Sequence, residues 1–586
     1  MKKKLGSQSN YQRIDRIDAM RIQLAHADAL LPLSLLGLLV GLLAGAVIVV
    51  FRLLVETSQD ALLPGVGPDN YEALPEWSSF LLPLTGAILL ALMFRFAGKG
   101  LHVLGVARVM ERMTYHQGHF TVRGFVLQFF GAAIAIISGQ SVGREGPHVF
   151  LGAASASLMG QYLSLPNNTI RIFVGCGTAA GIAASFNTPL AGVIFALEVV
   201  LMEYSVSSFI PVILAAVAAT AVSNVVLGNA AAFTVPTLEM GSLSELMLVI
   251  ILGLVAGAVS ALFVHLLQHF ARSSQGIAIW WRLLLAGAFM GLTGMFLPQL
   301  MSIGYDTVEL ALNDQLAIGL LVLLFMGKLL ATTIVIGLGV PGGIIGPILF
   351  IGAMLGAALA KLFLLLPFPL HTEAGFFALL GMGAMMSASL QAPLAALVAM
   401  LELTDNPAVM LPGMLAVVVA GVTTSELFRK QSLFQSMLNA STPGYHANPV
   451  LQSLRRVGVG SVMEQNFIHV DNRVSLKLAR EILYNKPAFI LIDKDDVPQT
   501  LMPAAELARY METRAEDDDD AIDLLEIPAL RWQAGSIHLQ ANLQEAYELL
   551  KSGTSEALFV ERSVRRHEHY IFGVLTLNMI KKAYKF

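Results

Sequence analysis

Long apolar stretches recur through the first three quarters of the sequence, and they constrain the fold more than any other feature. Examples are Leu31–Leu53, Phe80–Met93 and Leu246–Leu267. A helix needs about 20 predominantly apolar residues to cross the hydrocarbon core of a bilayer. Only 13% of the residues are charged, whereas a typical soluble domain carries about 25%. The sequence therefore predicts an all-α, multi-pass membrane domain whose partner is the lipid bilayer, rather than a protein with a single anchor.

Glycine and cysteine usage fits this class. The 51 glycines suit a membrane bundle, because small residues let helices approach closely and glycine lets a helix break where backbone lines a cavity. Cys176 is the single cysteine, so an intramolecular disulfide framework and a cysteine metal cluster are excluded. We expect no metal, no resident cofactor and no nucleic-acid partner.

The composition changes abruptly after Phe428. We expect a cytoplasmic segment over 1–29, a membrane domain over 30–428, a linker over 429–455 and a soluble α/β domain over 456–586. The first segment is basic, and its apolar run starts too late for a secretory signal. The positive-inside rule then places both termini in the cytoplasm, with the protein in the cytoplasmic (inner) membrane.

The soluble domain repeats a strand–helix–strand pattern. The expected strands are Phe467–Val470, Ala488–Ile492, Ser536–Leu539, Ala557–Val560 and Ile571–Leu575, and the expected helices are Leu476–Leu483 and Leu543–Leu550. The acidic run Glu516 to Asp520 lies between the two copies and is interpreted as a solvated loop.

The membrane domain also repeats itself, with halves of about 30–230 and 243–428. The matching segments are 185–191 followed by Glu198, 389–395 followed by Glu402, and the two Gly-Pro runs 143–147 and 343–347. Transporters are often built from two such halves, with the substrate site at their interface.

The most informative stretch is Ser138–Pro147, which places Arg144 and Glu145 in apolar surroundings. Intramembrane charges are costly and usually functional. Gly146 permits a break before a new helix, and free N–H groups at a helix start attract anions. The second half offers the same backbone without charge at Gly343, Ile344 and Ile345. We expect these two helix starts to form a mid-membrane anion site.

Glu145 is then a tethered anion beside an anion site. Its carboxylate can occupy the site and block it, or leave when protonated. A structural ion pair with Arg144 is the alternative, although adjacent residues on a helix do not face each other.

These motifs, together with Leu401-Glu402-Leu403-Thr404-Asp405-Asn406, resemble the CLC family of chloride channels and proton-coupled chloride transporters. The tail resembles the paired CBS modules of that family. The resemblance implies a chloride substrate, a homodimer with one pore in each subunit, two inverted halves and a gate at Glu145. It implies anion-binding positions at Arg144, Gly146, Gly343, Ile344, Ile345 and Phe434.

Several positions depart from the family pattern. Lys99 either stands where the family has an anion-coordinating serine or lies at a cytoplasmic helix end, and the helix end is the preferred reading. Ile345 stands where phenylalanine is usual, and Phe434 where a tyrosine hydroxyl is usual. Val199 replaces the inner glutamate of well-coupled members. We therefore expect channel-like chloride transport with weak or no proton coupling. The alternative is a proton-coupled chloride or fluoride antiporter, with Glu203 as the substitute proton relay.

Two readings from other classes stay open. Gly139–Gly143 fits the Gly-x-Ser-x-Gly pattern of a serine hydrolase, with Ser141 as nucleophile and His148 as the nearest base. A membrane sensor that works through its tail is the other reading. An adenine nucleotide between the CBS copies would use Thr576, but Asn578 replaces the aspartate expected for the ribose. The repeat and the anion site favour a transporter over an enzyme.

Overall fold

The computed structural model describes residues 16–26, 29–64, 69–97, 105–228, 240–364, 372–441, 453–494, 497–513, 521–553, 555–565 and 568–583. The chain divides into two compact units. One comprises Ser34–Tyr162 and Ile170–Tyr445, and the other comprises Met1–Leu33, Leu163–Thr169 and His446–Phe586. The four segments expected from the sequence, 1–29, 30–428, 429–455 and 456–586, stay a prediction.

The larger unit is helical, as expected for a membrane domain. The first half contains α2 (Leu30–Leu62), α3 (Glu76–Ala97), α4 (Val106–Tyr115), α5 (Val122–Ile137), α6 (Glu145–Tyr162), α7 (Asn167–Phe186), α8 (Pro189–Phe195) and α9 (Val206–Leu227). The second contains α10 (Leu246–Ser273), α11 (Ile279–Phe296), α12 (Tyr305–Leu312), α13 (Ile318–Gly337), α14 (Ile345–Phe363), α15 (Ala374–Leu390), α16 (Pro393–Thr404) and α17 (Met410–Val422), and α18 (Leu433–Ser441) follows it. Among the described residues, nine helices are long and apolar enough to cross a membrane.

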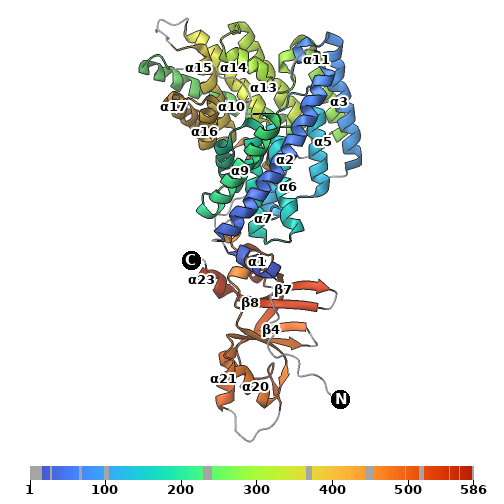
Figure 1. The fold of residues 1–586 in the computed structure, drawn as a ribbon, viewed down its shortest axis with the longest axis vertical. Helices are drawn as coiled ribbons and strands as arrows, with labels where there is room; N and C mark the ends of the chain where they lie inside the picture. Colours follow the sequence, from blue (N-terminus) through green and yellow to red (C-terminus); the bar gives the residue numbers. More distant parts are fainter. Residues whose placement is uncertain are drawn as a thin grey trace. The chain divides into compact units, whose positions relative to one another are not determined.

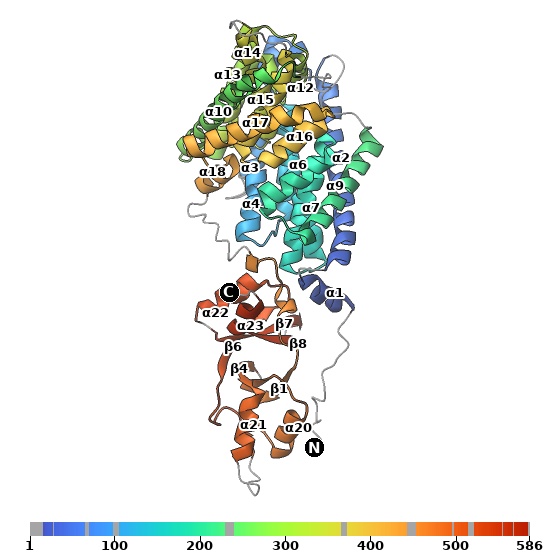
Figure 2. The ribbon, with the colours of Figure 1, turned by 90° about the vertical axis from the view of Figure 1, so that its left-hand side faces the viewer.

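Small residues set how closely the first half packs. Gly37, Gly41 and Gly45 follow one face of α2 and lie against Pro211, Ala215 and Ala219 of α9, which runs beside α2 in both views (Figures 1 and 2). A Cβ atom added at Gly41 would lie 2.3 Å from the carbonyl oxygen of Ala215. This spacing of small residues every four positions is the usual close-contact pattern of membrane helices.

The two halves cap each other's helices. The carboxylate of Glu198, in the π-helix η2 (Ala196–Leu201) that continues α8, accepts from the N–H groups of Leu394 (3.3 Å) and Ala395 (2.8 Å) in α16. Glu402 in α16 accepts in turn from the N–H groups of Leu190 (2.8 Å) and Ala191 (2.7 Å) in α8. The glutamates and prolines that mark the sequence repeat therefore meet across the junction of the halves. A carboxylate at a helix start satisfies free N–H groups and the helix dipole.

The tail forms a six-stranded mixed sheet in the order β1-β3-β4-β6-β7-β8. Its strands are β1 (Phe467–Asp471), β3 (Phe489–Lys494), β4 (Val497–Pro503), β6 (Trp532–His538), β7 (Ala557–Arg565) and β8 (Glu568–Thr576), and its helices are α20 (Leu476–Tyr484), α21 (Ala504–Thr513), α22 (Leu543–Lys551) and α23 (Leu577–Ala583). A small pair, β2 (Arg473–Val474) and β5 (Ile522–Asp523), lies apart. The expected α/β class is confirmed. Each copy pairs its first two strands in parallel, β1 with β3 and β6 with β7.

The joint between the two copies is filled by hydrophobic side chains. The antiparallel pairing of β4 with β6 connects them, and Leu491, Leu501 and Phe559 are buried there. The rings of Phe489 and Trp532 lie 6.2 Å apart beside this cluster. Thr576 ends β8 and Asn578 lies on α23. The acidic run 516–520 lies outside the described residues.

Helix α1 (Arg16–Ala25) and the segment Leu163–Thr169 belong to the same unit as the tail. Asp18 pairs with Arg562 at 2.6 Å, and Arg21 donates to the carbonyl of Leu163 at 3.0 Å. Asn167 donates to the carboxylate of Glu545 at 3.1 Å. These contacts join three stretches of chain that are far apart in sequence into one body.

Candidate anion site

A two-residue backbone bridge joins the two glycine motifs. The N–H of Gly143 donates to the carbonyl of Gly343 at 2.7 Å, and the N–H of Gly343 donates to the carbonyl of Gly143 at 2.6 Å. A Cβ atom at Gly146 would lie 2.7 Å from the Cα atom of Gly343, so only glycine fits there. The bridge brings the starts of α6 and α14 together, one from each half. The N–H of Gly343 is not a bare donor, which corrects that part of the expectation.

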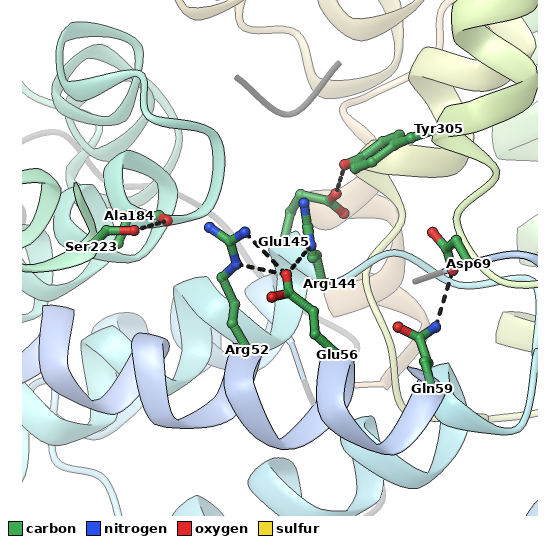
Figure 3. Close-up of polar contacts among 9 residues, drawn as sticks. All are labelled: Arg52, Glu56, Gln59, Asp69, Arg144, Glu145, Ala184, Ser223 and Tyr305. Carbon is green, nitrogen blue, oxygen red and sulfur yellow. Dashed lines mark hydrogen bonds and ion pairs between the residues drawn. The ribbon is translucent and has the colours of Figure 1, made fainter. Parts of the chain in front are cut away.

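Glu145 is the first residue of α6 and is fully buried. Its Oε2 atom accepts from the N–H of Gly346, in the first turn of α14, at 3.1 Å. Its Oε1 atom accepts from the hydroxyl of Tyr305, the first residue of α12. Figure 3 shows the Glu145 carboxylate directed toward Tyr305. The carboxylate thus lies at the helix start where the sequence predicts an anion, and its oxygen atoms stand in for one.

Arg144 forms its ion pair with a residue of α2. Its Nη1 atom lies 3.3 Å from Oε1 of Glu56 on α2, and Glu56 also binds Arg52, one turn earlier, at 3.0 Å (Figure 3). The Arg144 guanidinium lies over the Tyr305 ring, 5.4 Å from its centroid. The ion pair that the structure records for Arg144 is therefore with Glu56, and not the alternative pair with Glu145.

A buried lysine also lies in this region. Lys328 on α13 is fully buried, and its Nζ donates to the carbonyls of Leu300 (3.1 Å) and Ser302 (2.7 Å). It lies 4.9 Å from the centroid of the Phe350 ring. Sequence reasoning missed Lys328, although a lone lysine inside an apolar helix is itself a signal of function.

Two acidic residues, Asp69 between α2 and α3 and Asp306 in α12, also interact with these groups. Asp69 accepts from Gln59 of α2 at 3.1 Å (Figure 3). Burial raises the pKa of Asp69 above its ordinary value, and the negative charge of Asp306 acts in the same direction. Asp306 follows Tyr305 directly in α12.

The remaining predicted positions have different surroundings. Ile344 and Ile345 are buried at the start of α14. Ile345 lines an apolar cavity of about 30 Å³ together with Phe186 and Leu349. Phe434 is buried at the start of α18, and no described hydrogen bond brings it to Glu145. Lys99 and its neighbours 98–104 lie outside the described residues.

A second cavity, the polar vestibule, has a volume of about 260 Å³. Its lining includes Glu198, Val199, Gln391, Lys430 and Gln435, so Val199 faces space in which water fits. Met202 lines it too, and Glu203 is the next residue along the chain. Glu203 is half-buried and accepts from the Ser208 hydroxyl at 2.9 Å.

The residues of the hydrolase pattern do not form a catalytic pair. The Ser141 hydroxyl lies 3.0 Å from that of Thr332. Both ring nitrogens of the buried His148 lack a hydrogen-bond partner among the described residues. A nucleophilic serine needs its base within hydrogen-bond reach, so this geometry does not support the hydrolase reading.

Comparison with known proteins gives a consistent result. The family model described as "Voltage gated chloride channel" matches residues 85–425. The H(+)/Cl(-) exchange transporter ClcA of Vibrio cholerae is 32% identical over 424 residues, which cover 69% of this chain and 88% of the relative. A putative chloride channel protein, ClcB-like, of Ralstonia nicotianae is 31% identical over 360 residues, covering 60% and 83%.

Solved structures agree with the fold. A slow cyanobacterial Cl−/H+ antiporter shares 25% identity and a TM-score of 0.62, covering 70% of this chain and 97% of its own. A eukaryotic CLC transporter shares 17% identity and a TM-score of 0.56, and covers 96% of this chain and 98% of its own. The second match extends the similarity in fold through the tail, which is consistent with a pair of CBS modules.

Proposed function

This chain belongs to the CLC family of voltage-gated chloride channels, which places it among chloride transporters, and from that membership we propose that it exchanges chloride for protons across a cytoplasmic membrane. Glu145 is the proton-carrying gate. The relatives favour this alternative over the channel-like reading that Val199 and Phe434 suggested, because the Vibrio and cyanobacterial proteins are named as exchangers.

The observation that carries the proposal is the position of the Glu145 carboxylate. It is fully buried and held by the N–H of Gly346 and the hydroxyl of Tyr305. An anion entering this place must displace a carboxylate that is itself an anion. Away from these two donors, an unpaired carboxylate in an apolar interior is costly. Chloride and a proton therefore promote the same movement, which is the basis for coupling the two fluxes.

Protons also need a route on the other side of Glu145. Val199 cannot carry a proton and Phe434 has no hydroxyl. We infer that water in the polar vestibule, about 260 Å³ in volume, takes over this task. Glu203 is the titratable relay in this proposal, since it follows the vestibule residue Met202 and is half-buried. The vestibule faces the cytoplasm, with both termini on the same side.

The remaining features follow the family. We propose a homodimer with one anion site in each subunit, chloride as the physiological ion, and residence in the inner membrane. Arg144, Gly146, Ile344 and Ile345 surround the ion in this proposal. Gly343 supports the site through its backbone bridge to Gly143.

Purified protein in liposomes tests the proposal. An outward chloride gradient should drive protons inward against their own gradient, measured with a pH-sensitive dye. The reversal potential should shift with the pH difference at constant chloride. A reversal potential equal to the chloride equilibrium potential at every pH difference would contradict exchange and restore the channel-like reading.

A paired variant separates the relay from the gate. Glu203→Gln should reduce proton movement while chloride flux continues, because the amide cannot carry a proton. Glu373→Gln is the matched control, since Glu373 precedes α15 and is exposed. If Glu203→Gln leaves the ratio of protons to chloride unchanged, water alone carries the proton and Glu203 is not the relay.

A further inference from the structure

Tyr305 places its hydroxyl directly on the Glu145 carboxylate at the anion site. Its hydroxyl is one of two donors that the structure records on the Glu145 carboxylate, and the other is the N–H of Gly346. The residue is 8% exposed, and its ring lies 6.5 Å from that of Phe186. None of the sequence motifs includes it.

We propose that the Tyr305 hydroxyl is a ligand of the transported anion. When Glu145 is protonated and withdraws, the two donors that held its oxygen atoms remain in place. Chloride then occupies the position of the carboxylate and is bound by the O–H of Tyr305 and the N–H of Gly346. This inference rests on the proposed function, because it assigns a chloride ligand to the same site.

The surroundings of the ring support a donor role. The Arg144 guanidinium lies 5.4 Å from the ring centroid and is held there by Glu56. A cation over the ring draws electron density from it, so the hydroxyl becomes a stronger hydrogen-bond donor. The ion pair with Glu56, in turn, partly neutralises Arg144, so the anion does not experience its full positive charge. Neutral donors bind an anion without holding it too tightly for release.

The Tyr305 hydroxyl can also replace a donor that this chain lacks. Phe434 supplies no O–H at the position where the family pattern has a tyrosine. Tyr305 comes from a different element, the start of α12, and reaches the site from the side of Glu145. The anion is then coordinated by a phenolic donor at the gate instead of one beside Phe434.

A merely structural role for Tyr305 would be to anchor the Glu145 carboxylate. Measurements in a Glu145→Ala background exclude that role, because no carboxylate remains to be anchored. Chloride binding is measured by isothermal titration calorimetry on detergent-solubilised protein that is monodisperse by size-exclusion chromatography. Adding Tyr305→Phe should weaken chloride binding about tenfold, as expected for one hydrogen bond to a charged group.

Tyr71→Phe in the same background is the matched control. Tyr71 is also buried, but its hydroxyl donates to the carbonyl of Ile136 at 2.8 Å. Chloride affinity should stay within about twofold of the parent. A second substitution keeps the shape of the side chain: 3-fluorotyrosine at position 305 is a stronger donor and should tighten chloride binding about two- to threefold.

The outcomes distinguish a failure of the Tyr305 inference from a failure of the proposed function. If the Glu145→Ala parent binds chloride, and both Tyr305→Phe and the fluorotyrosine variant bind it with the affinity of the parent, Tyr305 is not a ligand. If the folded parent binds no chloride at all, the proposed function fails, and this inference fails with it.

Discussion

At the scale of single residues, the charge of Glu145 decides whether the anion site is open. Glu145→Gln keeps the size of the side chain and mimics its protonated form. Chloride flux should persist and lose most of its dependence on pH, because no group at the gate then titrates. Radioactive chloride uptake into liposomes, followed from acidic to neutral pH, measures this.

Glu76→Gln serves as the control for that variant, since Glu76 is exposed in the first turn of α3. It should reproduce the pH profile of the unmodified protein. Should Glu145→Gln also keep that profile, the gate is another residue.

The sequence identified the residues of the site that lie in a motif and missed those that come from elsewhere. Glu145, Arg144 and Gly146 are adjacent in a glycine-rich break, which marks them without a structure. Tyr305 lies 160 residues after Glu145, and Glu56 lies 88 residues before Arg144. Such pairs depend on how helices that are distant in sequence pack, within one half for Glu56 and Arg144 and between the halves for Tyr305 and Glu145, which no local pattern encodes. The expectation of a bare N–H at Gly343 failed for the same reason, because its partner Gly143 belongs to the other half.

At the scale of elements, the contact between α2 and α9 depends on the absence of side chains. Gly41→Ala should lower the stability of the folded protein by about 1–3 kcal/mol, because its Cβ atom meets the backbone of Ala215 at 2.3 Å and the helices must move apart. A thermal melt in detergent, followed by loss of monodisperse protein, measures the change.

Gly319→Ala in α13 is the control, because a Cβ atom there has no neighbour within 4 Å. Alanine is also the better helix former, so this variant should melt at an equal or higher temperature. Equal melting of both variants would show that α2 and α9 can separate at no cost.

The elements that sequence could predict are those with a strong, regular pattern. The long apolar helices and the strands β1, β3, β7 and β8 carry such patterns, and they appear in the structure. Strand β4 was missed because its sequence, Val497–Pro503, begins and ends close to prolines, which remove backbone donors and usually mark edges or turns. The π-helix η2 was missed because a single wide turn has no signature of its own.

At the scale of the whole molecule, the unit that contains the tail also includes the N-terminal helix α1, which an ion pair joins to β7. Asp18 is 6% exposed and is shared by Arg21 and Arg562. Arg562→Met should destabilise this unit by about 1–2 kcal/mol, because it removes one partner of a carboxylate that is largely buried, while the arginine itself is partly solvated. Hydrogen exchange of α1 should then become faster.

Lys581→Met is the comparison for that measurement, since Lys581 is an exposed residue in the last turn of α23. Its exchange pattern in α1 should match that of the unmodified protein. Unchanged exchange in Arg562→Met would mean that Asp18 is satisfied by Arg21 alone.

The crossed caps of Glu198 and Glu402 bear on how the chain is made. A ribosome delivers Glu198 long before Leu394 and Ala395, whose N–H groups it binds. Until then, the carboxylate of Glu198 and the N–H groups at the start of α8 lack these partners. We expect the membrane insertion machinery to bind this segment and keep it from the lipid during that time. Ribosome-arrested chains that end before Ala395 should therefore crosslink to that machinery through Leu190, whereas chains extended well beyond Glu402 should not. Equal crosslinking at both lengths would show that the first half assembles alone.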